Sequence, residues 1–172
     1  MKRFVCLLVF LVAGAAWAQK PPAELKQLNS FAGKWSCKGT VYAGDWGPEH
    51  AIVFTIDSHW SLGGQWLSTN YDETKTAKSP HPLKGLGLWG YDTDLKKFVS
   101  GWVDNNGTYQ TGQSDGWSGD TLTFTGPSHG GGMNGNARDI FTKKGAKQID
   151  HLFELEMGGT WKKIESDSCK KM

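Results

Sequence analysis

The sequence predicts an all-β protein: an antiparallel β-barrel of about ten strands with a short N-terminal helix. Three observations predict it. Glycine is abundant beyond residue 30 and recurs at strand-length intervals. The intervening segments alternate apolar and polar residues, as half-buried antiparallel strands do. A Gly-x-Trp sequence, Gly33-Lys34-Trp35, opens the first of these segments directly after the predicted helix. Its large indole ring is suited to filling the closed end of a small barrel.

Residues 1–18 have the pattern of a secretory signal peptide. Lys2 and Arg3 form a basic start, and Phe4 to Val12 form an apolar stretch too short to span a bilayer. Ala16-Trp17-Ala18 matches a small-x-small cleavage site. We therefore expect a signal peptide at 1–18 and a single periplasmic or secreted domain at 19–172, with no membrane span after cleavage.

The charge of the expected mature chain is balanced. The leader holds two of the 19 Lys and Arg residues and none of the 17 Asp and Glu residues, so 17 of each sign remain. Nucleic-acid-binding domains instead gather basic residues into a patch or stripe. The composition therefore argues against nucleic acid as a partner.

The helix is expected over residues 23–30, after Pro21-Pro22, with Leu25 and Leu28 on one face. Asp92 and Asp104 are expected to form turns, and longer loops are expected at 74–82 and 126–135. The predicted strands are 34–42, 49–58, 64–71, 84–91, 97–103, 108–115, 120–126, 136–143, 147–157 and 160–168.

Alternation within the strands predicts which side chains point inward. Two strands carry a histidine on a largely apolar face, and a third, 97–103, holds Trp102 and is apolar on both faces. The predicted inner-face residues of the two histidine-bearing strands are His50, Ile52, Phe54 and Ile56, and Ile149, His151, Phe153, Leu155 and Met157.

The Gly33-Lys34-Trp35 opening after a short helix resembles the lipocalin and fatty-acid-binding (calycin) superfamily. From about Leu28 to the C-terminus the chain is more closely similar to a family of bacterial proteins known only as a domain of unknown function, many of them exported and calycin-like. The blocks that carry this similarity include residues 85–92 (GLGLWGYD) and 97–104 (KFVSGWVD). The chain departs from the family at its end, where Cys169-Lys170-Lys171 replaces the expected Tyr-x-Arg.

The resemblance implies a calycin-like barrel and carries no activity with it. By analogy with calycins, Trp35 is expected to be buried at the closed end, with the stem of Lys162 or Lys163 covering its ring.

Two cysteines, Cys37 and Cys169, remain after the leader. An even pair in an exported protein is a disulfide candidate, and the spacing matches no metal motif. Cys37 lies in the first predicted strand and Cys169 at the end of the last, and these strands are neighbours in a closed barrel. The alternative is two unpaired thiols.

The leading functional hypothesis is a protein that binds a small, partly apolar molecule inside the barrel. Its expected ligand-binding residues are His50, Phe54, Trp102, His151 and Phe153. The sequence shows no catalytic constellation and no metal motif, which favours a binding protein over an enzyme. Two alternatives stay open: a haem-binding barrel enzyme of the nitrobindin type, with a histidine on the iron, and a structural or protein-interaction module with a packed barrel and satisfied core histidines.

Overall fold

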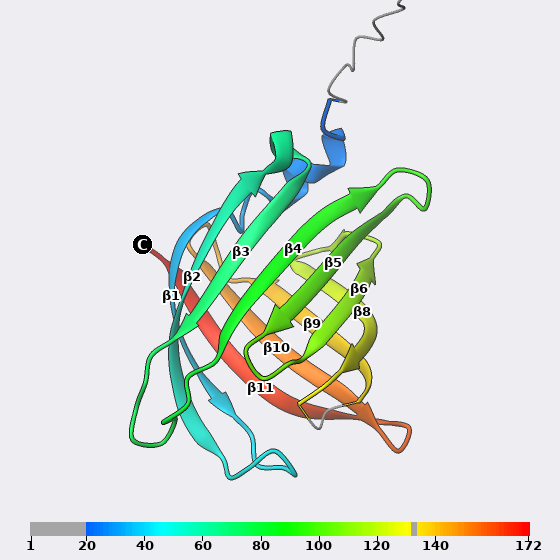
Figure 1. Ribbon diagram of the computed structural model, residues 1–172. Coiled ribbons are helices and arrows are strands. Elements are labelled where there is room, and N and C mark those ends of the chain that lie inside the picture. Colours follow the sequence, from blue (N-terminus) through cyan, green and yellow to red (C-terminus); the bar gives the residue numbers. More distant parts are fainter. Residues whose placement is uncertain (1–19, 132–133) are drawn as a thin grey trace, which may run out of the picture.

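The computed structural model describes residues 20–131 and 134–172, which form a closed antiparallel β-barrel of ten long strands (Figure 1). The all-β barrel predicted from the sequence is therefore confirmed. The predicted signal peptide at 1–18 lies outside the described residues.

Two short 3-10 helices accompany the strands, η1 (Ala23–Leu28) and η2 (Leu62–Gly64). The strands are β1 (Gly33–Val41), β2 (His50–Ser61), β3 (Trp66–Glu73), β4 (Lys84–Asp92), β5 (Lys97–Asp104), β6 (Tyr109–Ser114), β7 (Trp117–Ser118), β8 (Thr121–His129), β9 (Gly135–Lys143), β10 (Gln148–Met157) and β11 (Thr160–Lys171).

The strands form an up-and-down meander in which sequence neighbours are also spatial neighbours. The sheet closes because β11 pairs with β1 and β6 pairs with β8, while the two-residue β7 only extends the edge of β8. In the β1–β11 register Cys37 lies opposite Cys169. A closed sheet has no unpaired edge, so the backbone hydrogen bonds are satisfied all round the barrel.

The turns follow from local chemistry. Gly158 and Gly159, both at positive φ (60° and 75°), connect β10 to β11 as a two-residue hairpin loop. The Asp104 carboxylate accepts hydrogen bonds from the backbone N–H groups of Asn106 and Thr108, and Asp92 does the same for Asp94 and Leu95. Both aspartates are turn formers, as the sequence predicts.

The predicted elements differ from the observed bounds by up to three residues at an end, and the short β7 was not predicted. The N-terminal helix is a 3-10 helix that ends at Leu28. Strand β3 begins at Trp66 rather than at residue 64, because Gly63 and Gly64 have positive φ (69° and 85°) and form η2. Strand β8 continues three residues past its predicted end, to His129, because Pro127 and Ser128 still pair with β9 and His129 pairs with Tyr109 of β6.

One end of the barrel is closed by an aromatic and aliphatic plug. Leu25 and Leu28 of η1 are buried, and Phe31 follows them into the same cluster. Phe31 stacks on Trp117 at 5.6 Å between ring centroids and meets Trp89 edge-on at 4.5 Å. The helix that precedes the first strand therefore serves as the lid of this end.

Trp35 lies at the same end and is 3% exposed. Its Nε1–H donates to the carbonyl oxygen of Phe31 at 2.8 Å, which ties the strand to the plug. The basic residue over its ring is Lys171, with Nζ 5.3 Å from the ring centroid, so the expectation of Lys162 or Lys163 was wrong. The register explains the difference, because Lys171 is the cross-strand partner of Trp35.

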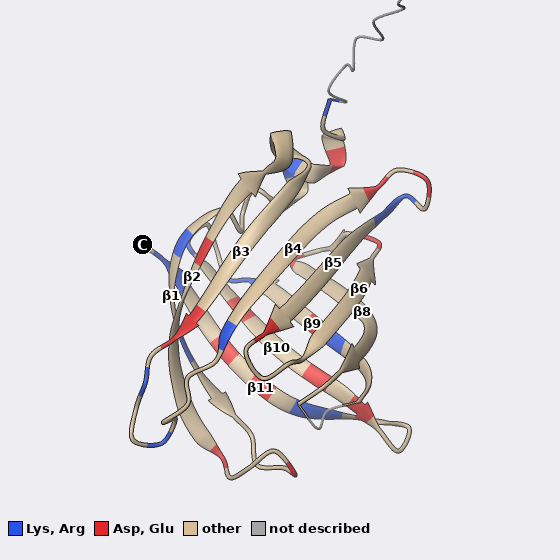
Figure 2. Ribbon diagram, in the orientation of Figure 1, with Lys and Arg blue, Asp and Glu red and all other residues tan. Residues whose placement is uncertain are grey.

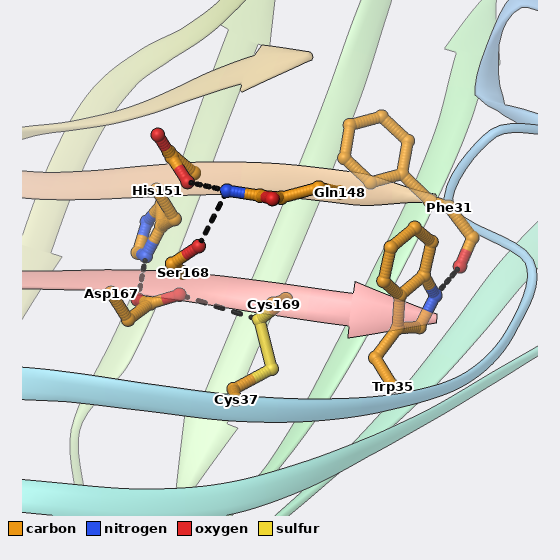
Figure 3. Close-up of a disulfide and its surroundings, with 9 residues drawn as sticks. Phe31, Trp35, Cys37, Gln148, His151, Asp167, Ser168 and Cys169 are labelled. Atoms are coloured by element: carbon orange, nitrogen blue, oxygen red, sulfur yellow. Dashed lines mark hydrogen bonds and ion pairs between the residues drawn. A yellow bond between two sulfur atoms is a disulfide. The ribbon is translucent and has the colours of Figure 1, made fainter. Parts of the chain in front are cut away.

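Cys37 and Cys169 form a disulfide between the first and last strands (Figure 3). Both cysteines are buried in the main core. The bond spans 132 residues, and for long loops the chain-entropy model places the stabilisation near the upper end of roughly 2–5 kcal/mol. The disulfide therefore fastens the seam at which the barrel closes.

We expect Trp35→Ala to lower the free energy of unfolding by roughly 3–5 kcal/mol, because the change opens a cavity in the plug. Urea denaturation followed by circular dichroism measures the loss. Trp35→Phe is the matched control, since it keeps a packed ring and removes the hydrogen bond to Phe31, so its loss should be clearly smaller. An unchanged midpoint for Trp35→Ala would contradict a structural role.

Candidate binding site inside the barrel

The barrel encloses a cavity of about 520 Å³. Phe31 and Trp35 form its floor at the closed end, and Trp46, Ser79 and Asn106 from the loops at the other end form its rim. Pockets of about 300–1,000 Å³ are typical of small-molecule sites. The side chains of the barrel therefore leave an interior space of ligand size.

All five residues that the sequence proposes as ligand-binding line this cavity. They are His50, Phe54, Trp102, His151 and Phe153. Their shared location follows from the alternation of β2, β5 and β10, which turns every second side chain inward. Whether they contact a ligand stays a prediction.

A glycine on the neighbouring strand β4 leaves the space that the Trp102 ring occupies. A Cβ atom at Gly85 would lie 2.1 Å from the indole of Trp102, so any larger residue would displace the ring. The indole Nε1–H donates to Asp104 at 3.2 Å. The ring is thus held by contacts on two sides and lines the cavity wall near the rim residue Asn106.

A polar cluster lies on the wall formed by β9, β10 and β11. His151 Nδ1 lies 2.8 Å from Asp167 Oδ2 and His151 Nε2 lies 3.1 Å from Asp139 Oδ1. Gln110 Nε2 donates to the second oxygen of Asp139 at 2.5 Å, and Phe141 stacks on the imidazole at 4.6 Å between centroids. Both ring nitrogens face carboxylates, so both donate when the ring is protonated.

Two opposing effects act on the pKa of His151. Burial favours the neutral ring, but the charges of Asp167 and Asp139 and their hydrogen bonds outweigh it and raise the pKa well above its ordinary value of 6.5. His151 is therefore an imidazolium held between two carboxylates at neutral pH.

Glu165 has a different environment. Burial, and then the negative charge of Asp167, raise the pKa of the Glu165 carboxyl from 4.5 to about 8, against the opposing effect of His151. Glu165 lines the cavity, so its accessible surface faces the interior space. Burial also raises the pKa of Tyr71, with Glu165 adding to the effect. Glu165 is thus a neutral acid at pH 7.

Glu73 of β3 is a further carboxyl group on the cavity wall. It is 8% exposed, and Oε2 accepts a hydrogen bond from the backbone N–H of Leu83 at 2.7 Å. Its other oxygen, Oε1, is buried and has no hydrogen-bond partner. Buried polar atoms in native proteins usually have a partner, so this atom requires an explanation.

The sequence analysis missed Tyr71, Glu73, Asp139, Glu165 and Asp167. One signal was present in β11: if Cys169 points inward to its disulfide, then Asp167 and Glu165, two and four residues earlier, point inward as well. A β-bulge then inserts Ile164 between Glu165 and Lys163, so both Ile164 and Glu165 reach the cavity.

His50 and His151 do not come together as one site. His50 Nδ1 lies 2.9 Å from the carbonyl oxygen of Pro48, next to the rim loop. His151 lies deeper, beside the disulfide, where Cys169 Sγ is 3.4 Å from Asp167 Oδ1 (Figure 3). A disulfide sulfur carries no proton, so this contact is packing against the carboxylate.

The arrangement does not fit haem ligation by His151, because both of its nitrogens already face carboxylates. His151, Glu165 and Asp167 place potential ligand atoms within 4.8 Å of one another. The contacts with Asp139 and Asp167 already use both nitrogens of the His151 imidazole. The group is therefore better suited to binding protons than to coordinating a metal.

A family model described as "Protein of unknown function (DUF1579)" matches residues 20–169. No curated protein matches the chain. Among solved structures, the crystal structure of Rv2717c from M. tuberculosis is similar, with a TM-score of 0.66 and 9% identity over 88% of this chain and 99% of that one. At this identity the likeness concerns the fold alone. No helix within residues 20–131 and 134–172 is long and apolar enough to cross a membrane.

We expect Glu165→Gln to reduce the loss of stability as the pH rises. The folded state holds the Glu165 proton with a pKa of about 8, against 4.5 for an ordinary glutamate. This group's stabilisation is therefore complete below pH 4.5 and is lost as the pH rises through 8, by at most about 1.4 kcal/mol per pH unit. Urea midpoints at pH 5, 7 and 9 measure the dependence.

His151, whose folded pKa is also raised, acts in the same direction and remains in the variant. Glu24→Gln, an exposed change on η1, serves as the control and should keep the dependence of the original chain. If Glu165→Gln has the same pH dependence as the original chain, Glu165 titrates normally and the buried-acid assignment is wrong.

Proposed function

The chain belongs to the DUF1579 family of proteins of unknown function, and we propose that it binds a small, partly apolar molecule inside its barrel. The cavity of about 520 Å³ is the single observation that carries the proposal. Its wall combines aromatic and aliphatic side chains with a few convergent polar groups, which is the usual composition of a small-molecule site. A ligand that removes apolar surface from water gains about 25 cal/mol per Å².

The rim offers a route for a ligand. Ser79, His81 and Leu83 of the loop between β3 and β4 line the outer part of the cavity, and Asn106 and Thr108 line it from the β5–β6 turn. Surface loops move more readily than paired strands. Opening at this end would leave both the ladder and the plug of η1 undisturbed.

The two alternative functions have less support. A packed structural module does not need an interior space of this size. A haem protein would need a free histidine nitrogen facing the cavity, and those of His151 face Asp139 and Asp167. His50 lies nearer the rim with its Nδ1 at the Pro48 carbonyl, so a haem alternative would depend on Nε2 of that histidine rather than on His151.

We further propose that the protein is exported. The leader-like residues 1–18 motivate this, and the Cys37–Cys169 disulfide supports it, because disulfides persist mainly in oxidising compartments. Basic and acidic side chains are interspersed around the barrel rather than gathered by sign (Figure 2), which agrees with the balanced charge of the expected mature chain.

A neutral apolar dye, Nile red, should bind saturably with a fluorescence increase and a stoichiometry of one. Gly87→Leu should weaken that binding by about tenfold or more, because the new side chain occupies cavity volume. A Cβ at Gly87 meets Thr69 and Trp102 at ordinary contact distances of 3.5 Å, so the strand accepts the change. Fluorescence titration measures both affinities.

Gly101→Leu is the matched control. The backbone of Gly101 borders the cavity, but Gly101 pairs with the 36% exposed Leu88, so an added side chain points outward, and a Cβ there has no neighbour within 4 Å. This variant should bind Nile red as the original chain does. Absence of saturable binding, or an equal loss in both variants, would remove the cavity as the binding site.

The mass of the protein recovered from its native host tests the export proposal. We expect a chain that begins at Gln19 and is two hydrogens lighter than its dithiol form, because the leader is cleaved and the disulfide forms. Intact-mass spectrometry under non-reducing conditions gives both numbers, and a reduced sample is the control. A full-length chain with three alkylatable thiols, Cys6 of the leader included, would contradict export.

A further inference from the structure

We propose that the ligand is an organic cation, an amine with an apolar body, whose ammonium group lies between Glu165 and Glu73 while its body packs on the aromatic wall. The inference rests on the proposed function and specifies the ligand class of the same cavity. Its basis is a charge imbalance, a set of unused acceptors, and aromatic rings beside them.

Acidic side chains outnumber basic ones on the cavity wall, where the charged imidazole of His151 is already paired with Asp139 and Asp167. The carboxyl side chains of the wall are Glu73, Asp104, Asp139, Glu165 and Asp167, and no Lys or Arg is among the described residues that line it. Arg138 directly precedes Asp139 on β9, but its guanidinium pairs with Glu154 and lies over the Trp161 ring. Successive strand residues face opposite sides of a sheet, so this arginine serves the outer face.

Three of the five carboxyl groups already have side-chain partners. Asp104 accepts from Trp102 and from its turn, Asp139 contacts His151 and Gln110, and Asp167 contacts His151.

Glu165 and Glu73 are the two groups that remain. The hydrogen bonds among the described side chains include none to the Glu165 carboxyl, and Glu73 uses only Oε2. The charge of Glu73 also contributes to the raised pKa of Glu165, so the two carboxyl groups lie in one region of the cavity. Both residues line the cavity and have acceptor capacity that the protein does not use, which complements a ligand that brings donors.

The unpartnered Oε1 of Glu73 points to the same ligand class. Leaving a buried acceptor unsatisfied costs about 1–3 kcal/mol, and more for a charged group. An ammonium group carries three N–H donors and a positive charge, so it satisfies this oxygen and Glu165 together. A neutral alcohol supplies one donor, and a carboxylate supplies none and adds a like charge.

Aromatic rings lie next to these carboxyl groups. Tyr71 is two residues before Glu73 on β3 and shares its inward face. Tyr71 stacks on Phe54 at 4.3 Å between centroids and meets Trp102 edge-on at 5.8 Å. Aromatic faces attract cations and also bury apolar carbon, so the wall suits both parts of an amine.

Titration of Glu165 provides an independent readout. In the empty barrel its pKa of about 8 keeps it protonated at neutral pH, and an incoming cation favours the ionised form. The charged and titratable groups that act on it are Asp167 of its own strand, His151 of β10, Glu73 and Tyr71 of β3, and Asp139 of β9. From β1 its cross-strand partner is the apolar Val41, which pairs in turn with His50 of β2.

The test uses three ligands of one chain length: decylamine, decanol and decanoate, each titrated as a competitor of Nile red at pH 6.5 and 8.5. We expect decylamine to bind about tenfold or more tighter than decanol at pH 8.5, and decanoate to bind more weakly than decanol. The decylamine affinity should rise about tenfold or more between the two pH values, because Glu165 ionises in this interval while the amine stays charged. The decanol affinity should stay constant.

Two variants locate the effect. Glu165→Gln should abolish both the amine preference and its pH dependence while decanol binds as before, and Glu73→Gln should reduce the preference. The exposed Glu24→Gln should behave as the original chain. Circular dichroism and the Nile red affinity of each variant show that the barrel and its cavity are intact.

The outcomes separate this inference from the proposed function. If Nile red and decanol bind but decylamine binds no tighter, the cation assignment is wrong and the binding function stands. If Glu165→Gln and Glu73→Gln both keep the decylamine preference of the original chain, the ammonium site is elsewhere. The assignment to these residues then fails. If Nile red and all three decyl ligands fail to bind, the proposed function fails, and the inference fails with it.

Discussion

Closure of the sheet at ten strands is the constraint on which the rest of this structure depends. Eight strands enclose an interior that side chains can fill or that holds one small ligand, and the diameter grows with strand number. The β1–β11 and β6–β8 pairings fix the circumference here, and a cavity of about 520 Å³ remains. Because the middle of the barrel is hollow, hydrophobic packing must be concentrated in the part of the interior where side chains from opposite walls are in contact.

That concentration lies at the closed end. Leu28, Phe31 and Trp35 form a continuous apolar cluster there. Two residues after Trp35 on β1, the Cys37–Cys169 disulfide links β1 to β11. The opposite end depends on turns and on the long loop between β3 and β4. Because local stability follows buried contacts, we expect the two ends to differ in rigidity: one supports the fold, and the other carries the loops through which we propose that a ligand enters.

The buried charges in the middle of the barrel oppose stability. His151 is held between Asp139 and Asp167, and Glu165 is kept neutral by burial. Buried ion pairs often contribute less than well-packed apolar side chains of the same volume, because desolvation offsets their attraction. Departures of this kind are expected where a protein has a function as well as a fold. The cluster is therefore the part of the barrel most informative about function, although the family match and the structural likeness assign none.

The sequence by itself determined the ten long strands, most of the inner faces of β2 and β10, and the seam. Period-two alternation placed His50, Phe54, His151 and Phe153 inward, and the positions of Cys37 and Cys169 at the two ends of the meander predicted their pairing. These conclusions need only local geometry and the fact of closure.

Only the tertiary structure decided the chemistry of the interior. Lys171 rather than Lys162 or Lys163 covers Trp35, because register between distant strands fixes that contact. The bulge at Ile164 turns two successive residues of β11 inward, which alternation alone cannot foresee. The raised pKa of Glu165 depends on burial, on Asp167 of its own strand, and on Glu73 and Asp139 from two other strands. Alternation is local and can be read along the chain, whereas register, bulges and burial arise when distant strands pair, and these bring the carboxyl groups together.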